Sequence, residues 1–254
     1  MVKSEDKMSS SSADSTEHVN KKRRIDKDSF GTNMVQVKVG PGKKLFKLHK
    51  KILCNVAPYF EAAFEGGFVE VTEQVLELPD EDAAMFRHFE LWVYTGDVLA
   101  TGESDADISW DSLVGLYIFG EIRGIPNLQN AAIDALIDKQ SSQNAIPTRF
   151  LPRVYDSTPE DSSLRRLFVD WVACLAAMIP NDRYTPTPPE APHQWFKKTA
   201  RMNYPKDFLF DLAFAQYQLR TGDKTVMSDF KSKRADYYVK PRAATSKSPV
   251  NGQE

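Results

Sequence analysis

Cysteines and long apolar runs are scarce in this sequence. Its 254 residues include only two cysteines, Cys54 and Cys174, and they form no Cys-x-x-Cys pair. This argues against a disulfide framework and favours a reducing, intracellular compartment. No apolar run approaches the ~20 residues of a membrane helix, and residues 1–30 lack the apolar stretch of a signal peptide. We therefore expect a soluble, non-secreted protein that does not contact a membrane.

Recognisable catalytic motifs are also missing. The sequence has no glycine-rich phosphate loop and no nucleophile elbow, and its four histidines are not at metal-ligand spacing. His88 lies among Phe86, Phe89 and Trp92, which favours a structural role. We predict that the protein is not an enzyme and holds no cofactor or metal.

Apolar residues are plentiful enough for a folded core, and charge is unevenly spread. Hydrophobic residues make up 41%, with 15 Phe and 4 Trp, and the net charge is −2. Residues 35–51 carry six lysines and no acid, whereas residues 61–111 carry fourteen acids and one base, Arg87. An acidic surface repels nucleic acid and suits a basic protein partner. Acids that merely solvate helix faces are an equally good interpretation.

Both ends of the chain are polar and low in complexity. Residues 1–33 and residues 231–254 lack apolar periodicity, so we predict that both are disordered. The first arm contains a basic cluster of the type that nuclear import receptors read, formed by Lys21, Lys22, Arg23 and Arg24. A solvated cluster without function is the alternative. The expected location is the nucleus, the cytoplasm or both.

Residues 34–139 show the pattern of one α+β domain. Valines alternate with polar residues from Val35 to Val39, and residues 40–42 supply a turn, which predicts a β-hairpin. Two short helices, a strand that ends at Pro79 and a core helix beginning near Asp80 or Asp82 follow. Next comes a helical hairpin, with its turn at residues 124–126.

Residues 140–230 read as a helical extension with a proline-rich loop. Residues 140–155 look like a connector, and a capping box at residues 157–160 predicts the start of a helix. Five prolines between positions 180 and 192 indicate a loop, and a last helix follows Pro205. The strongest helical pattern in the chain is an apolar stripe at spacings of three and four, formed by Leu164, Leu167, Phe168, Trp171, Val172 and Leu175.

This order of elements and three local segments resemble those of BTB/POZ domains. HKKILCNVAPYFEAAFEGGF is similar to the family's His-x-x-Leu to Ser-x-Tyr-Phe-x-x-x-Phe segment. VLELPDEDAAMFRHFELWVYTG resembles its strand, core helix and Tyr-Thr-Gly turn, and IRGIPNLQNAA resembles a later helix junction. The segment from Val154 to Gln218 resembles the helical extension of filamentous-fungal BTB proteins. The resemblance implies a small sheet packed with a cluster of helices and a role in protein–protein interaction. It also implies that His49, at the end of the second strand, is a structural residue.

The chain departs from the family pattern at two places: the first concerns self-association, and the second concerns a charged pocket that some transcriptional members use. Residues 1–33 show no amphipathic run that could form the helix which many homodimeric members exchange, and Met34 stands where the family has an acidic residue. The resemblance therefore leaves a homo-oligomer open.

One short motif points to a specific partner. In family members that recruit a cullin ubiquitin-ligase scaffold, an apolar residue, any residue and Glu stand after the second short helix, where this chain has Phe68, Val69 and Glu70. Phe68 would be the apolar anchor and Glu70 the orienting charge. A loop hydrophobe that covers its own domain is the alternative. We predict an adaptor that recruits a target to a cullin ligase, with a nuclear or transcription-associated scaffold as the second hypothesis.

Overall fold

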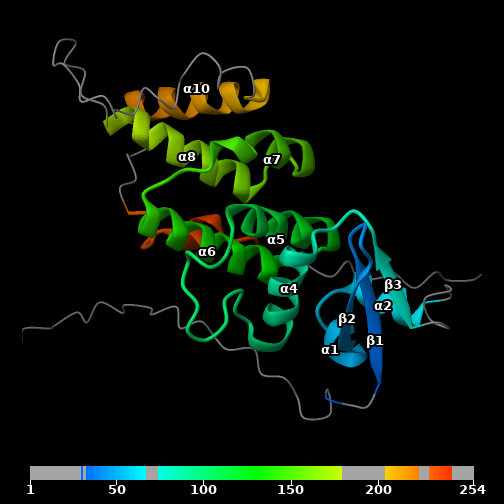
Figure 1. Cartoon of the computed structure of the whole chain (residues 1–254). Helices are drawn as coiled ribbons and strands as arrows, with labels where there is room; N and C mark the ends of the chain where they lie inside the picture. The colour runs from blue at the N-terminus through cyan, green and yellow to red at the C-terminus, as the bar shows by residue number, and fades with distance from the viewer. Residues whose placement is uncertain (1–29, 31–32, 67–73, 179–203, 223–228, 242–254) are drawn as a thin grey trace, which may run out of the picture.

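A three-stranded sheet lies at one end of the molecule (Figure 1). The computed structural model describes residues 30, 33–66, 74–178, 204–222 and 229–241, with the side chains of 175–178 left out. Strands β1 (Met34–Val39) and β2 (Lys44–His49) are antiparallel, and β3 (Val75–Leu78) runs parallel to β1, in the order β2-β1-β3. Alternate residues of β1 are buried, so the predicted hairpin is confirmed. Gly40 makes its turn with a φ of +74°.

Three helices lie next to this sheet: α1 (Lys50–Cys54), α2 (Pro58–Glu65) and α4 (Ala83–Thr95). Aromatic contacts join α4 to β2 and to α2. The ring of Phe86 on α4 lies 4.8 Å from that of Phe46 on β2, and Phe89 stacks on Phe60 of α2 at 5.8 Å. Asp82 caps α4 by accepting the Met85 N–H at 2.7 Å, which confirms the predicted start of this helix.

The predicted helical hairpin is formed by α5 (Trp110–Arg123) and α6 (Pro126–Gln143). Gly124 ends α5 with a φ of +65°, and Pro126 is the first residue of α6. At Gly120 the two helices approach so closely that a Cβ would lie 2.9 Å from Gln129 Cγ and 3.2 Å from the Ile125 carbonyl oxygen. The close contact requires a glycine at this position.

The extension stacks three further helices on this hairpin, on the side away from the sheet (Figure 1). They are α7 (Leu151–Ser157), which follows the 3-10 helix η2 (Thr148–Phe150), α8 (Ser163–Met178) and α10 (Lys206–Thr221). The predicted stripe on α8 is buried from Leu164 to Val172, and Trp171 is 1% exposed. No helix within the described ranges is long and apolar enough to cross a membrane.

Two boundaries predicted for this region are wrong. Residues 140–155 are not a plain connector, since α6 runs to Gln143 and α7 begins at Leu151. The capping box at 157–160 does not start a helix, because α7 ends there and α8 begins at Ser163. The cause is Arg165, which donates hydrogen bonds to the Tyr155 carbonyl at 2.7 Å and to the carbonyl and hydroxyl of Thr158. These bonds satisfy the end of α7.

The predicted disorder from residue 231 onward is wrong for residues 231–241. This segment contains the 3-10 helix η4 (Arg234–Tyr237) and packs on α6 and α8. Tyr237 is 3% exposed and donates a 2.7 Å hydrogen bond to Asp170 of α8. Arg234 forms ion pairs with Asp134 at 3.1 Å and Asp138 at 3.0 Å, both on α6.

Candidate protein-interaction site

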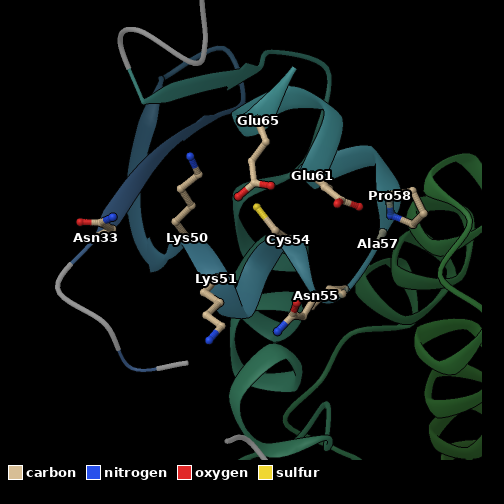
Figure 2. Close-up of a pocket in the computed structure, with 10 residues that line it drawn as sticks. Asn33, Lys50, Lys51, Cys54, Asn55, Ala57, Pro58, Glu61 and Glu65 are labelled. Carbon is tan, nitrogen blue, oxygen red and sulfur yellow. The ribbon is translucent and has the colours of Figure 1, made fainter. Parts of the chain in front are cut away.

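An open pocket lies between α1 and α2, on the sheet side of the molecule (Figure 2). Its volume is about 760 Å³. The walls come from both helices and from the three residues that join them, with Asn33 at one edge. The lining residues are Asn33, Lys50, Lys51, Cys54, Asn55, Val56, Ala57, Pro58, Glu61 and Glu65.

The angle between the two helices is fixed by local backbone features. Asn55 and Val56 donate their N–H groups to the carbonyls of Lys51 and Leu53, at 3.1 and 3.0 Å, and so close α1. Ala57 is extended, with φ −155° and ψ 146°, and Pro58 begins α2. Phe60 and Phe64 of α2 are fully buried. The pocket therefore has preformed walls that are anchored in the core.

The two helices carry charges of opposite sign at the pocket. Lys50 and Lys51 belong to α1, whereas Glu61 and Glu65 belong to α2 and are exposed (Figure 2). Such a polar rim around a concave surface suits a peptide segment with both backbone and charged groups to offer. Among the described residues, no group of three or more His, Cys, Asp or Glu is placed to hold a metal ion.

Cys54 lies at the pocket with a thiol that is poorly suited to nucleophilic chemistry. Burial, with help from the negative charge of Glu65, raises the pKa of this thiol to about 11. Its S–H donates a long hydrogen bond of 3.7 Å to the Phe60 carbonyl. The thiol stays protonated at neutral pH, and the thiolate is the reactive form. Cys174 is buried, whereas Cys54 is half-buried.

The two predicted site clusters lie outside the described residues. This holds for Phe68 and Glu70 and for the basic cluster at residues 21–24. The chain on either side of the first pair is described: Glu65 is the last residue of α2 and lines the pocket, and Gly66 ends the helix by donating its N–H to Ala62 at 3.0 Å. Phe68 thus follows the rim of the pocket by three residues.

Both candidate histidines are structural, as predicted. The backbone N–H of His49 donates to the Tyr94 hydroxyl at 3.1 Å, and its ring Nδ1 lies 3.0 Å from the same oxygen. Burial raises the pKa of Tyr94, so that phenol remains neutral. His88 Nδ1 hydrogen bonds to the Val98 carbonyl at 2.9 Å. Each ring links α4 to a neighbouring element.

The charge imbalance along the sequence is partly compensated in space. Lys38 and Lys43 both pair with Glu77 of β3, at 3.0 and 3.2 Å. Arg123, at the end of α5, pairs with Glu81 at 2.7 Å and stacks over the ring of Phe119. Two of the acids in the negative stretch of the sequence, Glu77 and Glu81, are thus paired with bases from other elements.

The sequence analysis did not single out the pocket residues. Each has an ordinary role when taken alone, because exposed lysines and glutamates usually only solvate a helix. The signal that could have found them is the succession of a short helix with only basic charges and a short helix with only acidic charges, separated by three residues.

The strands and helices from β1 to α5 coincide with a known domain. Residues 29–119 match the family model of the BTB/POZ domain. These residues form a BTB/POZ domain. The three-stranded sheet and the helices around it form the α+β fold that the resemblance implied. The BTB/POZ domain is a protein-interaction module and not a catalytic family.

A curated relative agrees with this assignment. The chain is 28% identical over 112 residues to "Kelch repeat and BTB domain-containing protein 8" of Xenopus tropicalis. The match covers 44% of this chain but only 17% of the relative. The chain therefore spans only a small part of the relative's length.

Proposed function

We propose that this protein is a non-enzymatic adaptor that recruits a target to a cullin ubiquitin ligase through its BTB/POZ domain. One observation carries the proposal: Phe68 and Glu70 directly follow α2, whose last turn borders the pocket between α1 and α2. In this proposal Phe68 fills an apolar hollow of the scaffold and Glu70 meets a donor beside it. An apolar anchor with a charged neighbour gives both affinity and orientation.

The pocket supports this role because its walls are rigid. Phe60 and Phe64 hold α2 in the core. Binding of a partner to Glu61, Glu65 and the following residues would therefore cost little conformational entropy in α2. The two lysines of α1 lie across the pocket from these acids, as Figure 2 shows. Their opposite charge would let the scaffold dock in one orientation.

A titration with purified components tests the proposal. We expect wild-type protein to bind a cullin N-terminal domain at micromolar concentration, and the double variant Phe68→Ala/Glu70→Lys to lose at least tenfold in affinity, since an interface anchor is worth ~2 kcal/mol or more. A matched control changes one apolar residue and one glutamate at exposed positions away from the pocket, as Leu45→Ala/Glu160→Lys.

Three outcomes separate the hypotheses. Loss of binding in the first variant alone, with an unchanged thermal midpoint, supports cullin recruitment. Wild-type protein that binds no cullin would exclude the ligase role. A double variant that unfolds would show that Phe68 belongs to the core of its own domain.

A nuclear scaffold without a ubiquitin role is the second candidate, and the basic cluster at residues 21–24 is the observation that favours it. Replacing these four residues by alanine should move a fluorescently tagged protein from the nucleus to the cytoplasm. The control replaces four bases near the other end of the chain: Lys233, Lys240, Arg242 and Lys247. An unchanged distribution in the first variant would assign the cluster no role in import.

A further inference from the structure

The segment at residues 229–241 lies across two helices in the way that a bound peptide lies in a groove. It contacts α6 and α8, and its only helix or strand is the four-residue η4. Figure 1 shows it in red beside α6. Tyr237 is its one buried residue, and most of the others are exposed. The segment is therefore held mainly by side chains of the two helices and not by a core of its own.

One wall of this groove is a polar stripe on α6. Asn130, Asp134 and Asp138 are four positions apart, so they share one face of the helix. The Asn130 side chain donates to the Val239 carbonyl at 3.1 Å and accepts the Val239 N–H at 2.6 Å. Asp134 and Asp138 hold the guanidinium of Arg234, at 3.1 and 3.0 Å. This wall thus recognises the backbone of one residue and the side chain of an arginine.

The other wall belongs to α8. Asp170 accepts a hydrogen bond from the Tyr237 hydroxyl at 2.7 Å, and Arg166 donates to the Asp236 carbonyl at 3.1 Å. Both walls therefore bind the backbone at one point and a long side chain at another. Protein grooves recognise peptides by this combination, in which backbone hydrogen bonds give affinity and side-chain contacts give specificity.

The acidic surface continues past the segment. A hollow of about 160 Å³ is lined by Asp134 and Asp138 on α6 and by Asp97 and Asp105 on the loop that faces it. Within the described ranges, no base forms an ion pair with Asp97 or Asp105. The nearby Lys139 donates to the backbone carbonyl of Asp105. The surface thus carries more negative charge than the segment neutralises, which favours an occupant that is more basic than the segment.

We propose that the groove between α6 and α8 is a peptide-recognition site, in which residues 229–241 compete with a basic segment of a partner protein. The partner's segment carries an arginine for Asp134 and Asp138. A tyrosine three positions later, as Tyr237 follows Arg234, donates to Asp170. The chain's own segment sets the affinity that a partner must exceed, and the unneutralised acids of the hollow provide the means to exceed it.

A tethered occupant makes such a site hard to detect. Its effective concentration is on the order of millimolar, so a free peptide of the same sequence competes poorly at micromolar concentration. The apparent affinity falls in proportion to the fraction of molecules whose groove is open. Weakening the tethered segment, while the two walls stay unchanged, should therefore reveal the site.

Fluorescence anisotropy of a labelled peptide with the sequence of residues 229–241 tests this competition on the full chain. The variant Arg234→Gln/Tyr238→Phe removes ion pairs and a hydrogen bond of the tethered segment but changes neither wall. It should bind the peptide at least tenfold more tightly than wild type, and Arg234→Gln alone should give a smaller gain. The control Arg220→Gln/Tyr217→Phe changes the same residue types at exposed positions of α10 and should bind as weakly as wild type.

A second arm changes only the peptide, so the folding of the protein cannot influence the result. Arg234→Gln in the peptide should reduce its affinity for the Arg234→Gln/Tyr238→Phe protein at least fivefold, because Asp134 and Asp138 lose their shared cation. Lys240→Gln in the peptide changes an exposed side chain and should leave the affinity almost unchanged. Equal losses for the two peptides would mean that the contact is a general charge attraction and not recognition by the groove.

Three further outcomes overturn the proposal. A peptide that binds none of the proteins would make residues 229–241 a fixed part of the fold. A peptide that binds wild type and Arg234→Gln/Tyr238→Phe equally would have its site elsewhere. A wild-type dimer that the peptide dissociates would make the segment of a second copy the occupant. None of the groove residues lines the pocket between α1 and α2, so a failure here leaves the proposed cullin binding untouched.

Discussion

The β1 to α6 region and the extension from α7 to η4 are held together by different kinds of contact. In the first region the rings of Phe46, Phe86, Phe89 and Phe119 follow one another at centroid distances of 4.8 to 5.2 Å. In the extension, apolar packing around Trp171 is supplemented by hydrogen bonds between residues far apart in the sequence.

Three tyrosines make bonds of this kind. Tyr155 of α7 donates to Asp211 of α10, Tyr237 donates to Asp170 of α8, and Tyr238 donates to Asp134 of α6, each at 2.7 Å. Burial raises the pKa of all three phenols, and the neighbouring carboxylates raise it further, so these hydroxyls remain donors at any physiological pH. The extension thus depends on a few specific polar contacts, whereas the BTB core depends on the sum of many apolar ones.

The largest expected effect comes from removing the segment that supplies two of these tyrosines. Deleting residues 229–254 should destabilise the protein by more than the ~3–5 kcal/mol that one buried aromatic contributes, because both Tyr237 and its bond to Asp170 are lost. Deleting only residues 242–254 should leave the thermal midpoint almost unchanged. Equal thermal midpoints for the two truncations would show that residues 229–241 contribute little to stability. The extension would then not depend on the hydrogen bonds of Tyr237 and Tyr238.

Trp171 tests whether the extension also has a core of its own. The side chain is 1% exposed and packs against Phe168 and Phe230, at centroid distances of 5.3 and 6.3 Å. Trp171→Ala should reduce the free energy of unfolding by ~3–5 kcal/mol, measured by urea denaturation.

Trp171→Phe is the matched control. It should cost much less, because it leaves a smaller cavity and removes an indole N–H for which the described residues provide no hydrogen-bond partner. If Trp171→Ala and Trp171→Phe reduce the free energy of unfolding equally, the loss does not come mainly from apolar packing. The indole N–H would then have a hydrogen-bond partner.

The difference between the regions explains what the sequence could predict. Hairpin, core helix and helical hairpin follow from local patterns, such as the valines of β1, the cap at Asp82 and the pair Gly124 and Pro126. The end of α7 depends on Arg165, which lies in the next helix. The order of residues 231–241 depends on acids that precede them by about 65 to 105 positions. Periodicity carries no signal for such contacts.

The candidate site was predictable only in part. Short motifs located Phe68 and Glu70 by their place after α2, and both remain predictions. The pocket beside them depends on the angle between α1 and α2, which arises from the backbone at residues 55–58 and from the burial of Phe60. A sequence shows which charges are near in the chain, but not that Lys50 and Glu65 line one hollow. The resemblance of residues 154–218 to fungal BTB extensions also stays a prediction.

Gly120 probes how tightly the first region is packed. Gly120→Ala would place a methyl group 2.9 Å from Gln129 Cγ, and overpacking of this kind typically costs ~1–3 kcal/mol, partly offset by the better helix propensity of alanine. Gly42→Ala is the control, because a Cβ there meets nothing within 4 Å. A stabilised Gly120→Ala variant would show that α5 and α6 can separate without loss.

The smallest effects compare one ion-pair cluster from each region. Arg234 is 26% exposed and joins Asp134 and Asp138 in the extension, whereas Glu77 is 45% exposed and joins Lys38 and Lys43 on the sheet. Arg234→Gln should cost about 1 kcal/mol, because it leaves two half-buried carboxylates without their shared cation. Glu77→Gln should produce no resolvable change at 150 mM salt, since water and ions screen an exposed pair.

Urea denaturation of both variants at 20 and 500 mM salt would test this contrast. The loss in Arg234→Gln should persist at high salt, because partly buried charges are screened less than exposed ones. A Glu77→Gln variant that is destabilised as much as Arg234→Gln at both salt concentrations would mean that ion pairs matter equally in the two regions. The dependence on specific polar contacts would then be a property of the whole protein and not of the extension.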